Sequence, residues 1–405
     1  MKCLPNPRSL ATLPLILMPF ASMCETDSYR NAEGAFKWKT LFANRELEVV
    51  SQPFVGVHTS GGLEPGLFTV HSTGVSTKPV VEAASAFLDT LRPDQQVRTV
   101  FGIDDPEWRR WCNVDNGIYV RQGSSLKEMD PAQRTAAINL MRASLSAKGL
   151  QLTEDIRKTD HTLGEINDNI LTYDEDLYFF TLMGIPSETE PWGWQVDGHH
   201  LVINYFVLGD QVVMTPAFLG AEPAVTTTGK YKGNSLFQDE QNQGLAFYRM
   251  LDPEQKDRAT LAKEKSGHSN RAEAFKDNLE LDFAGLAGKE MSAGQRAALL
   301  RLVSLYTGNL RDGHAELWLQ DIEDHLDETH FAWEGGDSDE AKFYYRIHSP
   351  VILIEFDHQQ PIGTTSINPP ELPTRDHIHT VIRTPNGNDY GKDLLRQHLE
   401  QHPHR

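Results

Sequence analysis

The hydrophobic positions of this 405-residue chain follow a helical period and then a strand-like period, in the same succession in two parts of the chain. Apolar residues recur at helical spacing over 131–145 and again over 293–307. Each helical stretch leads into β-rich runs bounded by Gly, Pro and Ser, which lie at 174–184, 194–206, 327–336 and 345–357. Helices followed by antiparallel strands within each part predict an α+β fold.

Short echoes of sequence relate the two parts. Residues 91–98 are echoed at 251–258, 160 residues later, and the segment that begins at Gly123 is echoed from Gly285, 162 residues later. Two matches in the same order at nearly the same offset predict a tandem duplication. Each half is expected to be a helical pair followed by an antiparallel β-meander, packed with the other about a pseudo-two-fold axis as one compact unit. The expected halves span 78–230 and 245–405.

Both copies carry signals for the start of a helix. Pro93 and Pro253 suit the first turn of a helix, where a proline loses no needed hydrogen bond. Asp130, which precedes a proline, and Ser292 have side chains that cap the start of a second helix. We therefore expect helices to begin at these four positions.

The N-terminal segment has the pattern of an export signal. Two basic residues precede an apolar run at 10–23 that is too short and too interrupted by proline to span a membrane. This pattern predicts a signal peptide at 1–23, an N-terminal extension at 24–77, and a secreted protein of the periplasm or the extracellular space. Cys24 leaves a lipid anchor as an alternative. No other segment is apolar enough to suggest a membrane span.

Composition and charge narrow the class of protein. Hydrophobic residues make up 39% and charged residues 23% of the chain, which is typical of a globular protein in water. The formal charge is −19, from 57 acidic and 38 basic side chains. Such an acidic protein repels phosphate backbones, so a small-molecule substrate is the expected partner and nucleic acid is not.

Histidines beside the predicted strands are the candidate chemistry. Residues i and i+2 of a strand share a face and lie about 6–7 Å apart, so the imidazoles of His377 and His379 can converge on one metal ion. His199 and His200 are adjacent and point to opposite faces. The polar lining that Asn204 gives to one face favours His200 as a ligand and leaves His199 as a contact of the ligands or of the substrate.

The β-rich run at 345–357 adds two carboxylates and an arginine to the candidate functional residues. Glu355 and Asp357 share a strand face and are the candidate catalytic groups, with Glu355 as a ligand or a base. Arg346 is a candidate contact for an anionic substrate. Imidazole donors suit zinc, copper or iron. The metal ligands expected between the two halves are His200, His348, His377 and His379.

Two tryptophans are candidates for ligand binding. Trp192 and Trp194 share one strand face and can stack on a ligand, although such residues more often belong to a core. Phosphate-binding loops, dinucleotide-binding glycine patterns, HExxH and GxSxG are all absent from the sequence. The side chains favour a metal-dependent hydrolase or oxidoreductase with a histidine-rich site. The alternative is a non-enzymatic exported ligand-binding protein whose histidines form a structural polar seam.

Several segments together resemble one protein family. Gly-His-His at 198–200, Arg-Ile-His at 346–348, and His-Ile-His at 377–379 followed by Asn-Asp-Tyr-Gly at 388–391 are the most specific of them. With "PEWRRW", "MDPAQR", "LYFFTLMG" and "FLGAEPA" they resemble the domain-of-unknown-function family number 3500, over about residues 80–402. The resemblance implies kinship but no activity, cofactor or residue role, because the family is named for an unknown function.

Overall fold

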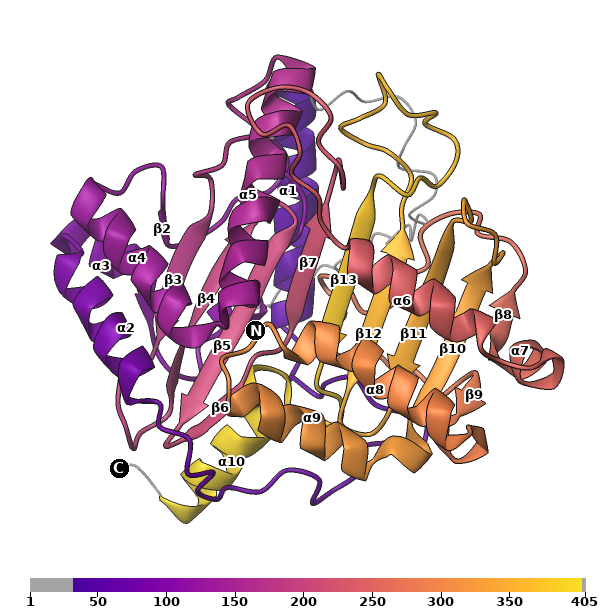
Figure 1. Cartoon of the computed structure of the whole chain (residues 1–405). Helices are drawn as coiled ribbons and strands as arrows, with labels where there is room; N and C mark the ends of the chain where they lie inside the picture. Colours follow the sequence, from indigo (N-terminus) through magenta and orange to yellow (C-terminus); the bar gives the residue numbers. More distant parts are fainter. Residues whose placement is uncertain (1–31, 403–405) are drawn as a thin grey trace, which may run out of the picture.

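One mixed β-sheet runs through the part of the chain that the structure describes, residues 32–402 of this computed structural model (Figure 1). The expected signal peptide at 1–23 and the lipid-anchor alternative at Cys24 lie outside the described residues. Within them the sheet has 13 strands. Their bounds are β1 (Val100–Phe101), β2 (Ser124–Ser125), β3 (Phe179–Met183), β4 (Trp192–Gly198), β5 (Leu201–Leu208), β6 (Gln211–Val213), β7 (Ala217–Ala221), β8 (Thr260–Ala262), β9 (Leu286–Ala287), β10 (His330–Gly335), β11 (Phe343–His348), β12 (Leu353–His358) and β13 (Ile378–Arg383).

The strand order reads in a similar way from both edges of the sheet. The main path is β1-β3-β4-β5-β7-β13-β12-β11-β10-β8, while β2 pairs with β3, β6 with β5, and β9 with β10. Neighbouring strands within β3-β4-β5-β7 and within β13-β12-β11-β10 are antiparallel. At the two edges β1 pairs in parallel with β3, and β8 pairs in parallel with β10. Antiparallel pairing of β7 with β13 joins the two sets of strands. The predicted α+β class is confirmed.

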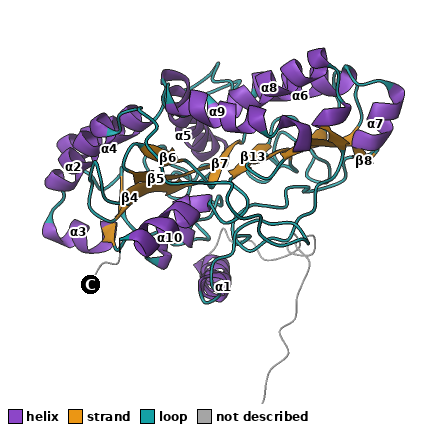
Figure 2. Cartoon of the chain, turned by 90° about the horizontal axis from the view of Figure 1, so that it is seen from below, coloured by secondary structure: helices purple, strands orange, loops and turns teal. Residues whose placement is uncertain are grey.

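Ten α-helices flank this sheet in the described residues. Their bounds are α1 (Ala32–Val50), α2 (Lys78–Thr90), α3 (Pro93–Thr99), α4 (Pro131–Ser144), α5 (Ala147–Asn167), α6 (Gln238–Arg249), α7 (Pro253–Ala259), α8 (Ala293–Thr307), α9 (His314–Asp324) and α10 (Lys392–Gln401). Figure 2 shows α2, α4, α5, α6, α8 and α9 along one face of the sheet, with α1, α10 and long loops on the other. None of the described helices combines the length and the apolar character that a membrane span requires.

The helix starts expected from the sequence are confirmed. α3 begins at Pro93 and α7 begins at Pro253. The Asp130 side chain accepts two backbone N–H hydrogen bonds at the start of α4, and the Ser292 side chain accepts one at the start of α8. These side chains satisfy donors that the first turn of a helix otherwise leaves without a partner.

Alternate residues of each strand point into two different cores. Side chains on the helix-covered face form the larger core, which contains Ile382, Trp192 and Trp194. Both tryptophans are completely buried, and Trp194 stacks between Phe180 and Tyr205. Their position is that of core residues, so the structure gives the expected ligand-stacking role of Trp192 and Trp194 no exposed ring face. The opposite, loop-covered face carries the candidate site.

A buried ionic network joins the last strand to the loops on this second face. Arg383 pairs through Nη1 with Asp277 (2.9 Å) and Asp389 (3.2 Å). Asp277 also pairs with Arg109 Nε (2.9 Å) and accepts a hydrogen bond from Tyr390 Oη (2.9 Å). All five side chains are buried, which is tolerated because each charge has charged or hydrogen-bonding partners. The Asn-Asp-Tyr-Gly segment therefore stabilises the fold around the site.

Candidate metal centre

The register of the sheet brings three of the candidate histidines together. His379 on β13 lies directly opposite Gly220 on β7, with Asp357 of β12 on its other side. His200 immediately precedes β5, and its carbonyl oxygen accepts a hydrogen bond from Gly220 N (2.8 Å). Because neighbours across a sheet point to the same face, His200 and His379 meet over Gly220. His377 lies two residues before His379 and therefore shares its face.

Gly220 leaves the space that these rings occupy. A Cβ atom at this position would lie 3.1 Å from His200 Cδ2 and 2.8 Å from the carbonyl oxygen of Ile378. The second of these contacts is with backbone, which cannot rotate away as a side chain can. Any larger residue here would push the His200 ring away from its partners.

His200 reaches the centre from a strained turn. It occupies the two-residue turn between β4 and β5 with a φ of 60°, a left-handed conformation that costs a non-glycine residue on the order of 1 kcal/mol. His200 N donates a hydrogen bond to the carbonyl oxygen of Asn113 (3.1 Å), which ties the turn to a covering loop. The surrounding structure therefore holds the turn in the conformation that aims the ring at His377 and His379.

The three Nε2 atoms form a nearly equilateral triangle. His377 Nε2 lies 3.0 Å from His379 Nε2 and 3.3 Å from His200 Nε2, and the third side measures 3.2 Å. Ligands that bind at about 2.0–2.1 Å in a tetrahedral arrangement lie about 3.3–3.4 Å from one another. The triangle thus has nearly the size of three corners of a metal tetrahedron. No other set of three His, Cys, Asp or Glu side chains in residues 32–402 forms such a group.

The outer nitrogen atoms of two rings have acceptors that determine where the hydrogens lie. His377 Nδ1 donates to the carbonyl oxygen of Gln360 (2.6 Å), and His379 Nδ1 donates to Glu273 Oε1 (2.8 Å). A neutral imidazole that donates through Nδ1 carries a lone pair on Nε2. When both rings are neutral, two lone pairs therefore face each other at 3.0 Å, and a cation between them removes the repulsion. Carbonyl and carboxylate acceptors on the outer nitrogen are also the usual supports of a metal-binding histidine.

Burial keeps the rings of His200 and His377 uncharged, as metal ligands must be. It lowers the pKa of His377 to about 4, against the opposing influence of the Glu222 carboxylate. Burial and the neighbouring imidazoles lower the pKa of His200 well below its ordinary value. Burial alone would raise the pKa of Glu273, but its contact with His379 lowers it, so this carboxylate is ionised. Two neutral donors, with an ionised carboxylate behind the third ring, favour the binding of a cation.

His199 lies beside the three rings and not among them. Its ring stacks on that of His200 with the centroids 3.9 Å apart. Its Nδ1 lies 2.6 Å from Asp160 Oδ1, and the same carboxylate accepts a hydrogen bond from Tyr178 Oη (2.7 Å). Burial alone would lower the pKa of His199, but the Asp160 carboxylate raises it. Asp160 thus fixes the ring and leaves its Nε2 edge without a partner in the described part of the chain.

Glu355 and Asp357 fasten a loop to the sheet. Glu355 accepts hydrogen bonds from two consecutive backbone N–H groups of the loop at 269–273 (2.8 and 2.9 Å). Asp357 accepts one from the first residue of that loop (2.8 Å). The loop carries Glu273 to His379. Neither carboxylate joins the group of three imidazoles, and the geometry gives both of them an anchoring position in place of the expected catalytic one.

His348, the fourth expected ligand, lies away from the other three. It pairs with Leu353 on β12, whose own partner on β13 is Arg383, four residues beyond His379. Two strand spacings and four residues amount to about 16 Å. Arg346, on the same strand as His348, lies opposite Glu355 and not at the imidazole triangle.

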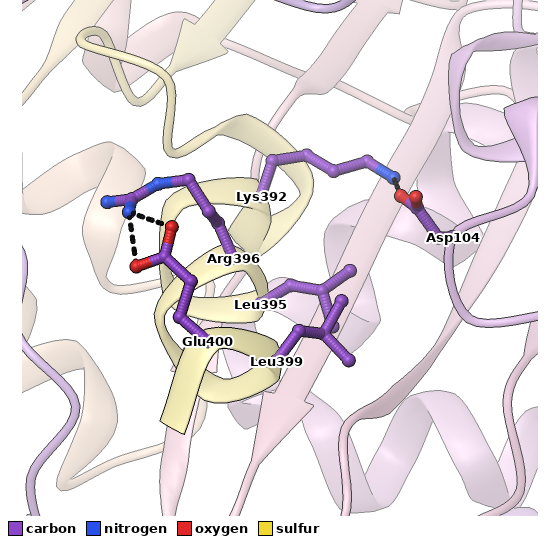
Figure 3. Close-up of a pocket in the computed structure, with 6 residues that line it drawn as sticks. All are labelled: Asp104, Lys392, Leu395, Arg396, Leu399 and Glu400. Carbon is purple, nitrogen blue, oxygen red and sulfur yellow. Dashed lines mark hydrogen bonds and ion pairs between the residues drawn. The ribbon is translucent and has the colours of Figure 1, made fainter. Parts of the chain in front are cut away.

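One hollow in the protein surface lies beside α10, away from the three imidazoles. Figure 3 shows its wall, which two leucines and two ion pairs form. Its two cations pair with carboxylates at 2.6 and 2.9 Å, so no charged group drawn there is left for a ligand. The lining residues are Asp104, Lys392, Leu395, Arg396, Leu399 and Glu400.

Three residues that shape the centre were not expected from the sequence. Glu273 lies 106 residues from the histidine that it supports and Asp160 lies 39 residues from its own. No local pattern links such pairs, because loop and helix packing bring them together. For Gly220 a signal exists, since a glycine inside a β-rich run marks a close approach.

The fold and the geometry define an α+β protein with three buried histidines that can hold a metal ion. The family described as "Protein of unknown function (DUF3500)" matches residues 73–392, and the chain belongs to this family. Curated proteins and solved structures gave no match. The matched region contains the three histidines and their supporting residues, so the centre is part of the family domain.

Proposed function

We propose that this chain is a metal-dependent enzyme, a hydrolase or an oxidoreductase, whose metal ion is held by His200, His377 and His379. The observation that carries the proposal is the convergence of three Nε2 atoms at 3.0–3.3 Å. In a polar seam without metal, each imidazole would direct its Nε2 at a complementary partner. Here the Nδ1 atoms of His377 and His379 both donate outward, so their Nε2 atoms face each other without a hydrogen of their own between them.

The donor set suits zinc, copper or iron, because imidazole nitrogen binds all three. A zinc ion with three histidine ligands and an open fourth position lowers the pKa of bound water to about 7, which supplies hydrolytic chemistry at neutral pH. Copper or iron on the same donors would instead support an oxidoreductase. Because imidazole binds a metal in its neutral form, three histidine ligands would leave the ion its full charge.

Residues around the triangle have positions that fit an enzyme. Glu273 holds the His379 ring at its outer nitrogen. His199, fixed by Asp160, presents its Nε2 edge next to the ring of His200. We assign His199 the role of contacting a small substrate bound at the metal. This role requires no movement of the ring, because stacking and the Asp160 contact already hold it.

Variants of the ligands test metal binding. His377→Ala and His379→Ala, in protein purified without chelator or affinity tag, are each expected to lose the metal and keep the far-ultraviolet circular dichroism of the wild type. His402→Ala removes an exposed histidine from the end of α10 and is expected to keep the metal. Retention of full metal content by both ligand variants would contradict the proposal.

The burial of the centre favours a second candidate, a structural metal site. His200 and His377 are each 2% exposed and His379 is 7% exposed. A structural ion is closed to solvent, whereas a catalytic one keeps an exchangeable position. Titration of the cobalt(II)-substituted protein with azide separates the two. A saturable change in the visible spectrum indicates an open position and an enzyme, and an unchanged spectrum indicates a structural centre.

We also infer that the two sets of strands arose by duplication and are related by a pseudo-two-fold axis. The strand order that reads alike from both edges supports this inference. So does a matching pair of glutamine contacts: Gln133 Nε2 donates to Gln95 Oε1, and Gln295 Nε2 donates to Gln255 Oε1, both at 2.6 Å. In a crystal structure the halves should superpose by a rotation near 180°, and an unrelated orientation would exclude the axis.

A further inference from the structure

Arg346, on β11, is a buried cation without an ion-pair partner. It is 4% exposed, its Nε makes no hydrogen bond, and no carboxylate within residues 32–402 pairs with its guanidinium. Glu355 lies directly opposite on β12, but its oxygen atoms accept hydrogen bonds from Tyr344 Oη (2.5 Å) and from loop backbone. Burying a charge is costly unless acceptors surround it. Arg346 therefore keeps donors that the described protein does not use.

A second orphaned group lies two residues further along the same strand face. His348 is 1% exposed, and its Nδ1 has no hydrogen-bond partner in the described chain. Residues i and i+2 of a strand lie about 6–7 Å apart on one face, which the long Arg346 side chain can span. Burial, and then the charge of Arg346, lowers the pKa of His348 to about 3. The ring is thus neutral at pH 7 and offers one N–H donor.

A small residue and a partly exposed aromatic pair lie around these two groups. Ala332, directly opposite Arg346 on β10, adds little bulk. His330 lies opposite His348, and Phe283 stacks on His330 (centroids 5.2 Å, interplanar angle 1°) and packs edge-on against His348 (4.6 Å, 64°). His330 and Phe283 are only half-buried. The two orphaned groups therefore lie beneath a partly exposed aromatic rim.

Two carboxylates limit what this place can accept. Glu355 faces Arg346 across the strand pair. Asp282, which is exposed and accepts a hydrogen bond from Ser60 N (2.7 Å), lies close enough to His348 to affect its pKa. Their repulsion disfavours a multiply charged anion and favours a ligand group with a single charge.

The place is also separate from the imidazole triangle. The loop at 269–273 is hydrogen-bonded to Glu355 and Asp357 on β12, and β12 lies between β11 and β13. The loop thus stands between Arg346 and His379. A molecule held at one place does not reach the other without displacing this loop.

We propose that Arg346 and His348 bind a small oxyanion, a carboxylate group of a ligand, at a site distinct from the metal centre. The guanidinium fork matches the two oxygens of a carboxylate, and the free N–H of His348 donates to one of them. The site shares no residue with the proposed metal centre, so it stands whether or not a metal binds.

Calorimetric titration of the full chain with acetate, and separately with inorganic phosphate, tests the site. Acetate should bind saturably, and Arg346→Met should weaken it by about 10- to 100-fold, as expected for loss of charge-assisted hydrogen bonds. Arg396→Met, which removes an exposed arginine paired with Asp393 and Glu400, should leave it unchanged. Tighter binding of phosphate with the same dependence on Arg346 keeps the oxyanion site and reassigns its ligand to phosphate. Wild-type protein that binds neither anion, or an Arg346→Met protein that binds as the wild type does, overturns the proposal.

A second measurement needs no variant and so does not depend on folding of the substituted protein. Crystals of the wild-type protein soaked in perrhenate, a singly charged oxyanion, should show an anomalous rhenium peak beside the Arg346 guanidinium. Ordered water bonded to the guanidinium, with no rhenium peak there, overturns the site. The metal content of the Arg346→Met protein should equal that of the wild type. Loss of anion binding in this variant is then independent of metal binding.

Discussion

The behaviour of the centre is set, residue by residue, by where each imidazole can place its hydrogen. His377 and His379 each have an acceptor on the outer nitrogen, a carbonyl in one case and a carboxylate in the other. His200 has no such acceptor in the described chain, and its Nδ1 is buried. Two rings are thus fixed in the tautomer that binds a metal, and the third is held by its backbone turn and by Gly220.

Removing the carboxylate behind His379 should weaken metal binding. Glu273→Ala is expected to lower the affinity by about 10- to 100-fold, the usual loss when the partner of a metal-binding histidine is removed. Competition with a chelator of known affinity measures this change. Glu264→Ala, at an exposed position upstream of the loop that carries Glu273, is the matched control. Equal affinities for the two variants would show that Glu273 does not support the ligand.

Adding one methyl group at Gly220 should displace the His200 ring. Gly220→Ala is expected to reduce metal affinity and to destabilise the fold by about 1–3 kcal/mol, because the new Cβ meets backbone as well as the ring. Gly102→Ala is the control, since a Cβ there meets nothing within 4 Å. Chemical denaturation and metal titration measure the two effects. Wild-type metal affinity in Gly220→Ala would mean that His200 is not a ligand.

Some of this residue-level chemistry can be predicted from sequence. The two-residue period of a strand is enough to pair His377 with His379, and the polar lining from Asn204 favoured His200 over His199. His348 was expected beside them because the sequence does not say which ends of which strands meet. The order and register of the strands decide which strand ends meet. They place His348 at the end of β11 that lies away from His379.

Among the elements, the loop at 269–273 matters as much as the strands. Its anchors, Glu355 and Asp357, lie 83 to 88 residues further along the chain. Sequence shows two carboxylates on one strand face, which is also the pattern of a catalytic pair. Whether such groups react or anchor a loop depends on where a distant backbone runs, and no local pattern contains that information.

Loss of the Glu355 anchor should release this loop. Glu355→Ala leaves buried backbone donors without an acceptor and is expected to cost about 2–4 kcal/mol of the free energy of unfolding. It should also weaken metal binding, because Glu273 is carried by the same loop. Glu340→Ala, at an exposed position, is the control. Denaturation with urea, with and without metal, provides both readings; an unchanged unfolding midpoint would argue against the anchoring role.

At the scale of the whole molecule, the α+β class follows from the succession of helical and strand patterns. The strand order reads alike from β1 and from β8, which supports the duplication that we propose. The loops that cover the second face have no regular hydrophobic period, so their packing cannot be predicted from the sequence. They contribute Glu273 and Asp277, and with them the support of His379 and the partner of Arg383.

Buried Glu107 should make stability depend on pH. Burial raises its pKa from 4.5 to about 8, against the opposing charge of Arg110, and its Oε2 has no hydrogen bond among the described residues. Between pH 4.5 and 8 the folded state keeps this proton and the unfolded state does not, so stability falls as pH rises. Across this range the wild-type protein should lose roughly 2–4 kcal/mol of its free energy of unfolding through this group, and the Glu107→Gln protein should not. Denaturation of both proteins at pH 5 and pH 8 measures the difference. Equal losses of unfolding free energy in the two proteins would show that Glu107 does not cause the pH dependence.

Metal content is the measurement that tests the central claim most directly. Elemental analysis of the untagged protein, reconstituted with zinc, copper or iron and freed of excess ion, should find about one equivalent of one of them. The double variant His377→Ala/His379→Ala should hold almost none. Less than about 0.3 equivalents of any transition metal in the wild-type protein, after reconstitution, would contradict the account.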